Sequence, residues 1–310
     1  MNELDLIIIV AGPAGMSAAL FAQGDELKFS LIEEGKPCGF VERVINTNFT
    51  NLENYLGIYG VDGTEVQRIF AKHLESRKIP IESARVNELM DEGNTLTLRT
   101  DAGNMASKTV ILATGTRPKK IIVPGIKDVM SRVYYSVDEE TFKSYNGREI
   151  LVVGGRNSGV VTAIRLKEWG CKPIVIEKSS VSTAKNRYIE RLRELKIPYL
   201  FSSELERITE EGALLAAHIR VGDSRRLFNP AAIVGCIGYV PNNELALLLG
   251  LSVDKDGYVI VNREMQTSNE RVFAAGDLNG GVKMIAVAVG EGATAEYYVN
   301  SLVRSKWKRE

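Results

Sequence analysis

Two glycine turns in the sequence carry the residue types that hold a dinucleotide. The first, Gly12 to Gly15, follows the apolar run Asp5–Val10, and Glu33 ends the next apolar run. The second turn, Gly154 to Gly159, follows the apolar run at residues 149–153, and Glu177 ends the next apolar run. A dinucleotide-binding βαβ unit has this order of elements: a strand, a glycine turn, a helix, a second strand and an acidic residue. The spacing therefore predicts two such units in this chain.

The elements that must position these turns are short buried strands and the helices that follow them. The runs at residues 5–10 and 149–153 are unbroken and apolar, as parallel strands buried on both faces are. An apolar helix is expected from about Val282. The other predicted elements are strands at 28–32 and 173–176 and helices at 16–23 and 160–169.

The order of the segments predicts the domain organisation. Prolines at 118 and 124, and again at 241, mark hinges on either side of the second unit. The outer segments, 1–116 and 243–310, should therefore form one discontinuous domain, with 117–242 inserted into it. The predicted fold class is α/β, with two Rossmann-like dinucleotide-binding domains of the three-layer ββα type.

Composition excludes several classes of protein. The chain has 310 residues, of which 39 are basic, 39 acidic and 45% hydrophobic, which is typical of a globular protein and not of a disordered one. Zero formal net charge argues against a nucleic-acid partner. The early apolar run Leu6 to Ala11 is too short to span a membrane, so we expect a cytoplasmic protein without a membrane partner.

Cysteines and histidines give no sign of a metal site. Cys38, Cys171 and Cys236 lie far apart in the sequence, which suits neither a disulfide framework nor metal-ligand spacing. The two histidines, His73 and His218, stand alone and are interpreted as structural. We therefore expect no metal.

Several motifs in order carry a resemblance to a known family. They are Gly12-Pro13-Ala14-Gly15, Glu33, Glu53 to Gly57, Ala113-Thr114-Gly115, Gly238 to Pro241, and Ala274 to Asp277 with Gly290-Glu291-Gly292. With these motifs the chain resembles, over nearly its whole length, the low-molecular-weight thioredoxin reductases of the pyridine nucleotide-disulfide oxidoreductase superfamily. The resemblance implies FAD in domain 1–116 and 243–310, an NAD(P)-binding-like domain in 117–242, and a homodimer.

The physical properties of the motifs agree with an FAD site. Gly12 lets the backbone approach a pyrophosphate, Gly15 lets the helix pack on the strand, and Glu33 accepts hydrogen bonds from a ribose. The family places the ribityl chain on Asp277 and the pyrimidine edge of the flavin at the start of the last helix. The candidate FAD residues are Gly12, Pro13, Ala14, Gly15, Glu33, Glu34, Gly39, Asn54, Thr114, Gly115, Gly276, Asp277, Lys283, Met284 and Ile285. The candidate residues for the nicotinamide nucleotide are Gly154, Arg156, Asn157, Ser158 and Glu177.

The chain departs from the family's pattern at Val10 and at the redox disulfide. Val10 stands where the family has its first motif glycine, and a β-branched residue there is expected to require a shifted backbone. Counting back from Gly154 places Val137 and Glu140 where relatives that reduce thioredoxin carry a Cys-x-x-Cys pair. Cys38, beside Gly39, is either a lone thiol near the flavin or a buried, inert cysteine.

A third departure concerns the nicotinamide nucleotide. Arg156 occupies the position of the second motif glycine, where it either crowds the pyrophosphate or grips the phosphates. Glu177 to Ser180 stand where relatives that use NADPH carry a basic cluster. A carboxylate at the strand end suits a free 2′-hydroxyl, so NADPH is disfavoured, NADH is possible and another donor stays in play.

Together these features predict an FAD-dependent oxidoreductase that passes electrons from NADH or another donor directly to a non-disulfide acceptor. That acceptor could be oxygen, a quinone, a second flavin, or a ferredoxin or other redox protein. No protein acid or base is needed, so no catalytic residue is assigned. Tyr134 or Tyr135 either covers the flavin or packs elsewhere. The alternative is a non-enzymatic FAD-binding sensor or scaffold.

Overall fold

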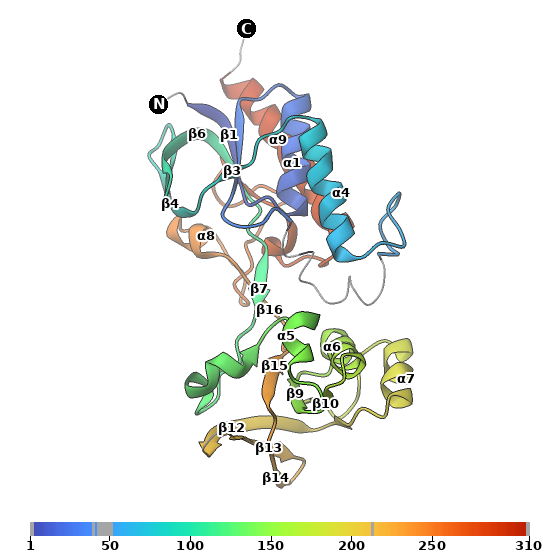
Figure 1. Ribbon diagram of the computed structural model, residues 1–310. Coiled ribbons are helices and arrows are strands. Elements are labelled where there is room, and N and C mark those ends of the chain that lie inside the picture. The colour runs from blue at the N-terminus through green and yellow to red at the C-terminus, as the bar shows by residue number, and fades with distance from the viewer. Residues whose placement is uncertain (1–2, 39–40, 42–51, 212–213, 308–310) are drawn as a thin grey trace. The chain divides into compact units, whose positions relative to one another are not determined.

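The computed structural model describes residues 3–38, 41, 52–211 and 214–307, which form two compact units (Figure 1). Unit 1 contains the described residues up to 117 and from 240 onward, and unit 2 contains those of 118–239. Two short strands, β7 (Thr116–Pro118) and β16 (Tyr239–Pro241), pair where the chain passes from one unit to the other. The units end at 117/118 and 239/240, whereas the sequence-based boundaries are 116/117 and 242/243.

Unit 1 is built on a sheet with strand order β3-β2-β1-β6-β5-β4, and β17 pairs with β6. Strands β1, β2, β3, β6 and β17 are joined by parallel pairings, and β4, β5 and β6 by antiparallel ones. Ile7 and Ile8 of β1 are fully buried, since layers cover both faces of this strand. The strands are β1 (Leu4–Ile9), β2 (Phe29–Glu33), β3 (Glu82–Ser83), β4 (Val86–Asp91), β5 (Leu96–Thr100), β6 (Gly103–Leu112) and β17 (Val272–Ala274).

The helices of unit 1 include a closely packed pair, α1 and α9, which lie side by side in Figure 1. A Cβ at Gly292 of α9 would lie 2.0 Å from the carbonyl oxygen of Ala14 in α1, so this crossing requires a glycine. Helix α1 begins at Pro13, three residues before the predicted start, because proline is well suited to the first helical position. The helices are α1 (Pro13–Gly24), α4 (Gly63–Ser76), α8 (Glu244–Leu248), the 3₁₀ turn η2 (Gly276–Asn279) and α9 (Ile285–Lys306).

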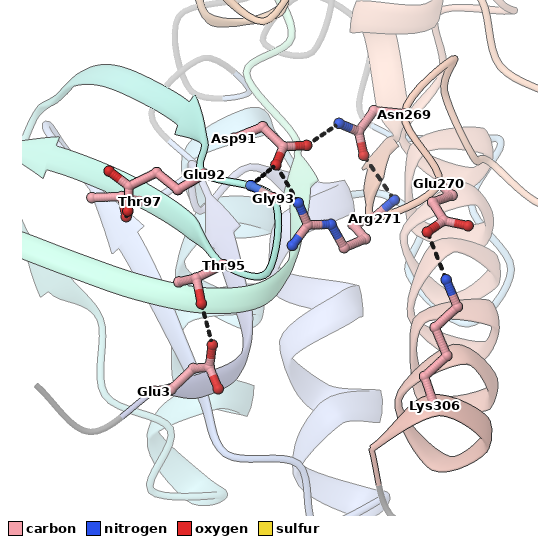
Figure 2. A network of polar contacts seen from close by, with 10 residues as sticks. All are labelled: Glu3, Asp91, Glu92, Gly93, Thr95, Thr97, Asn269, Glu270, Arg271 and Lys306. Carbon is pink, nitrogen blue, oxygen red and sulfur yellow. Dashed lines mark hydrogen bonds and ion pairs between the residues drawn. The ribbon is translucent and has the colours of Figure 1, made fainter.

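An ion pair between the buried Arg271 and the partly exposed Asp91 ties the β4–β5 hairpin to the loop before β17 (Figure 2). The guanidinium of Arg271, which is 6% exposed, donates a hydrogen bond to the carboxylate of Asp91. Asn269 Nδ2 and the backbone N–H of Gly93 also donate to this carboxylate, at 2.7 and 2.8 Å. Because burying a charge is costly unless it is hydrogen-bonded, this network fixes the hairpin next to β17.

Unit 2 repeats the βαβ pattern on a parallel sheet of order β11-β10-β9-β15-β8, and a three-stranded antiparallel sheet accompanies it. The parallel strands are β8 (Val133–Tyr134), β9 (Glu149–Val153), β10 (Lys172–Ile176), β11 (Tyr199–Leu200) and β15 (Ala232–Gly235). The antiparallel strands are β12 (Ser203–Glu211), β13 (Leu214–Val221) and β14 (Ser224–Phe228). The helices are η1 (Ile126–Arg132), α5 (Glu139–Lys143), α6 (Asn157–Glu168) and α7 (Asn186–Glu194).

These two sheets with their helices confirm the predicted α/β fold class. Helix α9 begins at Ile285, three residues after the predicted start, because Met284 has an extended backbone with φ −139°. In the described part of the chain, no helix is both long and apolar enough to cross a membrane. The same residues contain no group of three histidine, cysteine or acidic side chains arranged to hold a metal ion.

Candidate functional site

The glycine turn of unit 1 is held closed by Glu33 at the end of β2. One carboxylate oxygen, Oε2, accepts a hydrogen bond from the backbone N–H of Ala11 at 2.9 Å. The other, Oε1, accepts one from the N–H of Gly35 at 2.8 Å. The carboxylate therefore lies directly beside the turn between β1 and α1, where it could also accept a ribose hydroxyl.

The glycine turn of unit 2 is built in the same way. Glu177, which follows β10, accepts from the N–H of Gly155 at 2.7 Å through Oε2 and from the N–H of Ser179 at 3.0 Å through Oε1. The ring of Tyr199 closes the other side, and its hydroxyl donates to the carbonyl oxygen of Gly155 at 2.5 Å. A Cβ at Gly155 would lie 2.5 Å from this ring. Both predicted dinucleotide turns thus share one architecture.

Val10 corrects one expectation from the sequence. A β-branched residue was expected to shift the backbone of the first turn, but Val10 has φ +81°, close to the +102° of Gly154 at the matching place in unit 2. A Cβ on Gly15 would lie 2.0 Å from the carbonyl oxygen of Val10, and one on Gly159 would lie 1.7 Å from that of Gly154. The expectation was wrong because Val10 adopts the left-handed conformation of a glycine and leaves the turn unchanged.

The start of α1 presents an open cradle. Gly12 has φ −79°, and none of the described atoms would lie within 4 Å of a Cβ placed on it. Pro13 is the first residue of the helix, Ala14 is buried behind it, and no described side chain caps the helix N-terminus. Free backbone N–H groups at a helix start attract phosphate. The structure therefore brings Gly12 to Gly15 together with Glu33 around a space suited to a pyrophosphate.

Asp277 and its neighbours form the second part of the unit 1 site. Gly276 donates its N–H to Glu291 Oε2 at 2.7 Å, and Asn279 Nδ2 donates to the same oxygen at 2.8 Å. Glu291 of α9 thereby fixes the η2 turn that carries Asp277. The hydroxyl of Thr116 donates to Asp277 Oδ2 at 3.4 Å. Burial raises the pKa values of both Asp277 and Glu291, as expected for carboxylates that water solvates poorly.

The segment before α9 brings three further candidates to the same unit. Lys283 Nζ donates to the hydroxyl of Tyr258 at 2.8 Å and lies 4.6 Å from the centre of its ring. The side-chain amide of Asn54 lies 3.8 Å from Met284 Sδ, although 230 positions separate the two residues. Ile285 is the first residue of α9. The charge of Lys283 opposes the effect of burial on the pKa of Asp277, so its ammonium influences that carboxylate.

Thr114 and Gly115 are fixed by a residue that sequence reasoning missed. Thr114 Oγ1 donates to the carbonyl oxygen of Asn242 at 2.7 Å, and Asn242 Nδ2 donates to that of Thr114 at 2.7 Å. The N–H of Asn242 donates to the carbonyl oxygen of Gly115 at 2.9 Å.

Glu34 lies at the surface, 3.5 Å from Arg85. The predicted Gly39 lies outside the described residues. Glu291, Thr116 and Tyr258 were also not assigned; Glu291 lies within a quoted motif, and Asn242 lies next to another.

The remaining candidates of unit 2 surround the start of α6. Arg156 is exposed and immediately precedes the helix, with Gly155 buried on its other side. Asn157 Oδ1 accepts from the N–H of Lys185 at 2.9 Å, which ties the loop after β10 to the helix start. Ser158 lies in the first turn of α6, and its carbonyl oxygen accepts from the hydroxyl of Thr162. Arg156 is therefore an exposed residue at the start of α6, where no described side chain caps the free N–H groups of the helix.

The three cysteines are poor candidates for thiol chemistry. Burial and the nearby Glu33 carboxylate raise the pKa of Cys38 to about 12, and burial raises the pKa of Cys236 to about 11. Burial also raises the pKa of Cys171. Because the reactive form is the thiolate, these raised pKa values disfavour thiol chemistry at neutral pH. This favours the interpretation of Cys38 as a buried, inert cysteine.

Their positions also keep the cysteines apart. Cys171 comes directly before β10, and Cys236 comes directly after β15. Both strands run parallel to β9, so Cys171 lies at the amino end and Cys236 at the carboxyl end of the parallel strands in unit 2. Cys38 belongs to unit 1, where its N–H donates to the carbonyl oxygen of Ala11. All three cysteines are free.

The tyrosines, and the two positions that the sequence analysis matched to the family's cysteine pair, have partners within unit 2. The hydroxyls of Tyr134 and Tyr145 lie 3.0 Å apart, and Tyr135 accepts from the N–H of Ile121 at 2.8 Å. Val137 is 8% exposed and belongs to an apolar cluster. Both tyrosine hydroxyls therefore have partners in their own unit, which favours packing over flavin stacking.

Glu140 lies in α5 and is exposed. Asp138, just before this helix, accepts a hydrogen bond from the N–H of Thr141 at 2.8 Å and so caps the helix. The segment expected to match the family's redox pair is thus a capped helix start with exposed polar residues.

Comparisons with known proteins agree with this architecture. The family described as pyridine nucleotide-disulphide oxidoreductase matches residues 4–292. Thioredoxin reductase of Bacillus subtilis (strain 168) is 28% identical over 310 residues, which is 96% of this chain and 95% of that protein. The solved thioredoxin reductase of Lactococcus lactis is 27% identical, with a TM-score of 0.88 over 98% of this chain and 100% of that one. Bacillithiol disulfide reductase of Bacillus cereus, at 20% identity, shares the fold, with a TM-score of 0.86 over 97% and 100% of the two chains.

Proposed function

The chain belongs to the pyridine nucleotide-disulphide oxidoreductase family, and we propose that it is an FAD-dependent enzyme that passes electrons directly to a non-disulfide acceptor. NADH is the proposed donor. The proposed acceptor is oxygen, a quinone, a second flavin, or a ferredoxin or other redox protein. We propose a homodimer, as in the family that the sequence resembles.

The state of the cysteines is the observation that carries this proposal. Relay of electrons through a disulfide needs two sulfur atoms that can bond to each other. Cys171 and Cys236, however, lie at opposite ends of the parallel strands of one sheet. The raised pKa values of Cys38, Cys171 and Cys236 disfavour thiol chemistry at all three residues. An electron acceptor that needs no protein thiol is the simplest consequence.

The residues of unit 1 fit FAD. The open space at Gly12 beside the free N–H groups of α1 would receive the pyrophosphate, and Glu33 would accept from the ribose. Asp277 is buried enough for its pKa to rise, so a hydroxyl of the ribityl chain would improve the solvation of its carboxylate. When bound, FAD supplies the redox chemistry, and the chain's own residues bind it, orient it and exclude water.

The residues of unit 2 favour NADH over NADPH. The Glu177 carboxylate already accepts hydrogen bonds from two backbone N–H groups, which fix it beside the turn. Such a carboxylate accepts a hydrogen bond from a free 2′-hydroxyl and repels a 2′-phosphate. We propose that Arg156 grips the pyrophosphate, since it is an exposed residue at the N-cap of α6, where free helix N–H groups attract phosphate.

Anaerobic titration of the flavin-loaded protein tests the function. We expect NADH to bleach the visible flavin band at a lower concentration than NADPH does, and air to restore it. No NAD(P)H-dependent turnover should appear with thioredoxin or a disulfide dye. Dithionite gives the fully reduced control spectrum. A flavin that dithionite bleaches but NADH leaves oxidised would refute the proposed donor, and thioredoxin-dependent turnover would refute the non-disulfide acceptor.

Substitution of Arg156 distinguishes whether its side chain binds the pyrophosphate or blocks the nucleotide. We expect Arg156→Ala to raise the KM for NADH by about three- to tenfold and to change kcat little, because a charge-assisted contact to phosphate binds ground state and transition state alike. Steady-state kinetics with an acceptor dye measures both constants. Arg226→Ala, at an exposed arginine of β14, is the matched control and should match the wild type. A lower KM in Arg156→Ala would mean that the side chain crowds the nucleotide.

A further inference from the structure

The residues after β10 are bonded to the end of β11 and to the start of β12. The N–H of Glu177 donates to the carbonyl oxygen of Leu200 at 2.8 Å, and that of Ser203 donates to the carbonyl oxygen of Glu177 at 2.8 Å. The N–H of Ser202 donates to the carbonyl oxygen of Ser179 at 3.0 Å. These three bonds fix the end of β11 and the first residue of β12 beside the segment that begins at Glu177, whose carboxylate is proposed to bind the ribose.

The lysine in this segment is engaged by a glutamate of β12. Lys178 Nζ donates to Glu204 Oε1 at 2.8 Å. The second oxygen, Oε2, accepts from Arg220 Nη2 at 2.6 Å, and Arg220 lies directly opposite Glu204 in the β12–β13 register. The bond from Lys178, aided by the two positive charges, lowers the pKa of Glu204 despite some desolvation. Glu204 is therefore ionised at neutral pH.

We propose that Glu204 is a specificity-determining residue that disfavours nucleotides with a 2′-phosphate by engaging Lys178. This inference rests on the proposed binding of the ribose at Glu177. A 2′-phosphate at that carboxylate would need a cation, and Lys178 is the first cation that follows it in the chain. Glu204 already accepts a hydrogen bond from the Lys178 ammonium group. Its own negative charge would also repel a 2′-phosphate at this site. A free 2′-hydroxyl is uncharged and needs no cation, so this ion pair does not weaken the binding of a nucleotide without a 2′-phosphate.

Two adenosine probes test this discrimination without any flavin chemistry. Calorimetry on the flavin-loaded protein measures the Kd of AMP and of adenosine 2′,5′-bisphosphate. In Glu204→Gln, we expect the affinity for the bisphosphate relative to AMP to rise about fivefold, because exposed ion pairs are worth little and only one charge is removed. The affinity for AMP itself should stay the same. The gain should shrink at high salt, which screens exposed charges.

Matched variants on the same strand sharpen the test. Glu206 is two residues further along β12 and pairs with Arg220 at 3.4 Å and Arg225 at 2.8 Å. Glu206→Gln removes the same charge from the same sheet without releasing Lys178, so it should leave the ratio of the two affinities unchanged. In the double variant Glu204→Gln/Lys178→Ala, the gain should vanish because the released lysine is gone. All these side chains are partly exposed, and thermal melting checks that each variant is folded.

Each outcome supports or overturns the inference. An unchanged ratio in Glu204→Gln, an equal gain in Glu206→Gln, or a gain that survives the loss of Lys178 overturns it. Failure of either probe to bind any variant also overturns it. If the ratio shifts as expected but NADH does not bleach the flavin, the discrimination by Glu204 stands and the proposed electron donor is wrong.

Discussion

Gly15→Ala is expected to abolish FAD binding and to lower the stability of unit 1 by about 3 kcal/mol or more. The added Cβ would lie 2.0 Å from the carbonyl oxygen of Val10 and 3.3 Å from the side chain of Ile8. The first of these is a backbone atom of a turn that Glu33 holds closed, so it cannot swing away as a flexible side chain could. The turn must open, and the start of α1 must move with it.

Gly12→Ala, three residues earlier, is the matched control for this effect. None of the described atoms would lie within 4 Å of the new Cβ, and a φ of −79° suits alanine. At a helix N-cap, alanine is less favourable than glycine by about 1 kcal/mol, which is well below the loss expected for Gly15→Ala. We therefore expect only a small drop in the melting temperature without FAD, but an affinity for FAD lowered by about tenfold or more if the pyrophosphate approaches the backbone here.

Flavin absorbance after gel filtration and thermal melting of the FAD-free protein measure the two properties. Weaker FAD binding in both variants, with a large loss of stability in Gly15→Ala alone, is the expected pattern. Normal FAD binding in Gly12→Ala would show that the pyrophosphate lies elsewhere. Wild-type stability in Gly15→Ala would show that the turn between β1 and α1 is not close-packed in solution.

The parts of the site that the sequence predicts are those formed by neighbours in the chain. The turn before α1 and the acid after the next strand are encoded within about 25 residues, because a βαβ unit is a local structure. Val10 shows the limit of this reasoning: its residue type predicts a shifted turn, yet packing of α1 on β1 holds it at φ +81°. Tertiary context overrides the preference of a single residue.

The partners that sequence reasoning missed are joined by contacts between distant parts of the chain. Asn242 meets Thr114 across 128 positions, and Lys283 meets Tyr258 across 25. No spacing rule predicts such pairs, because they depend on how separate elements pack. Glu291 belongs to a motif that the sequence analysis quoted, but its role in fixing Gly276 follows only from the geometry of α9 against η2.

A buried carboxylate on α9 leads to the second large effect, which concerns stability against pH. The side chain of Glu296 has no exposed surface, and neither carboxylate oxygen has a hydrogen-bond partner among the described residues. Burial raises its pKa to about 8, the negative charge of Asp25 adds to this, and Arg304 opposes it. Glu296 is thus mainly protonated at neutral pH in the folded protein.

Glu296→Gln is therefore expected to stabilise the protein above neutral pH. In the unfolded chain the carboxyl group titrates near its ordinary value of about 4.3, so between that value and about 8 the folded state binds more protons at this residue. Stability falls as pH rises through this window and levels off above it. At about 1.4 kcal/mol per pKa unit, the loss amounts to several kcal/mol. Glutamine keeps the shape of the neutral acid and removes this loss.

Urea denaturation with excess FAD, at several pH values from about 5 to 9, measures the effect. The wild-type midpoint should fall with rising pH relative to that of Glu296→Gln, and the two should approach each other near pH 5. Glu75→Gln, at an exposed glutamate of α4, should follow the wild type throughout. Parallel profiles for the wild type and Glu296→Gln would mean that Glu296 is solvated or paired in solution, since a buried, unpartnered carboxylate must lose stability when it ionises.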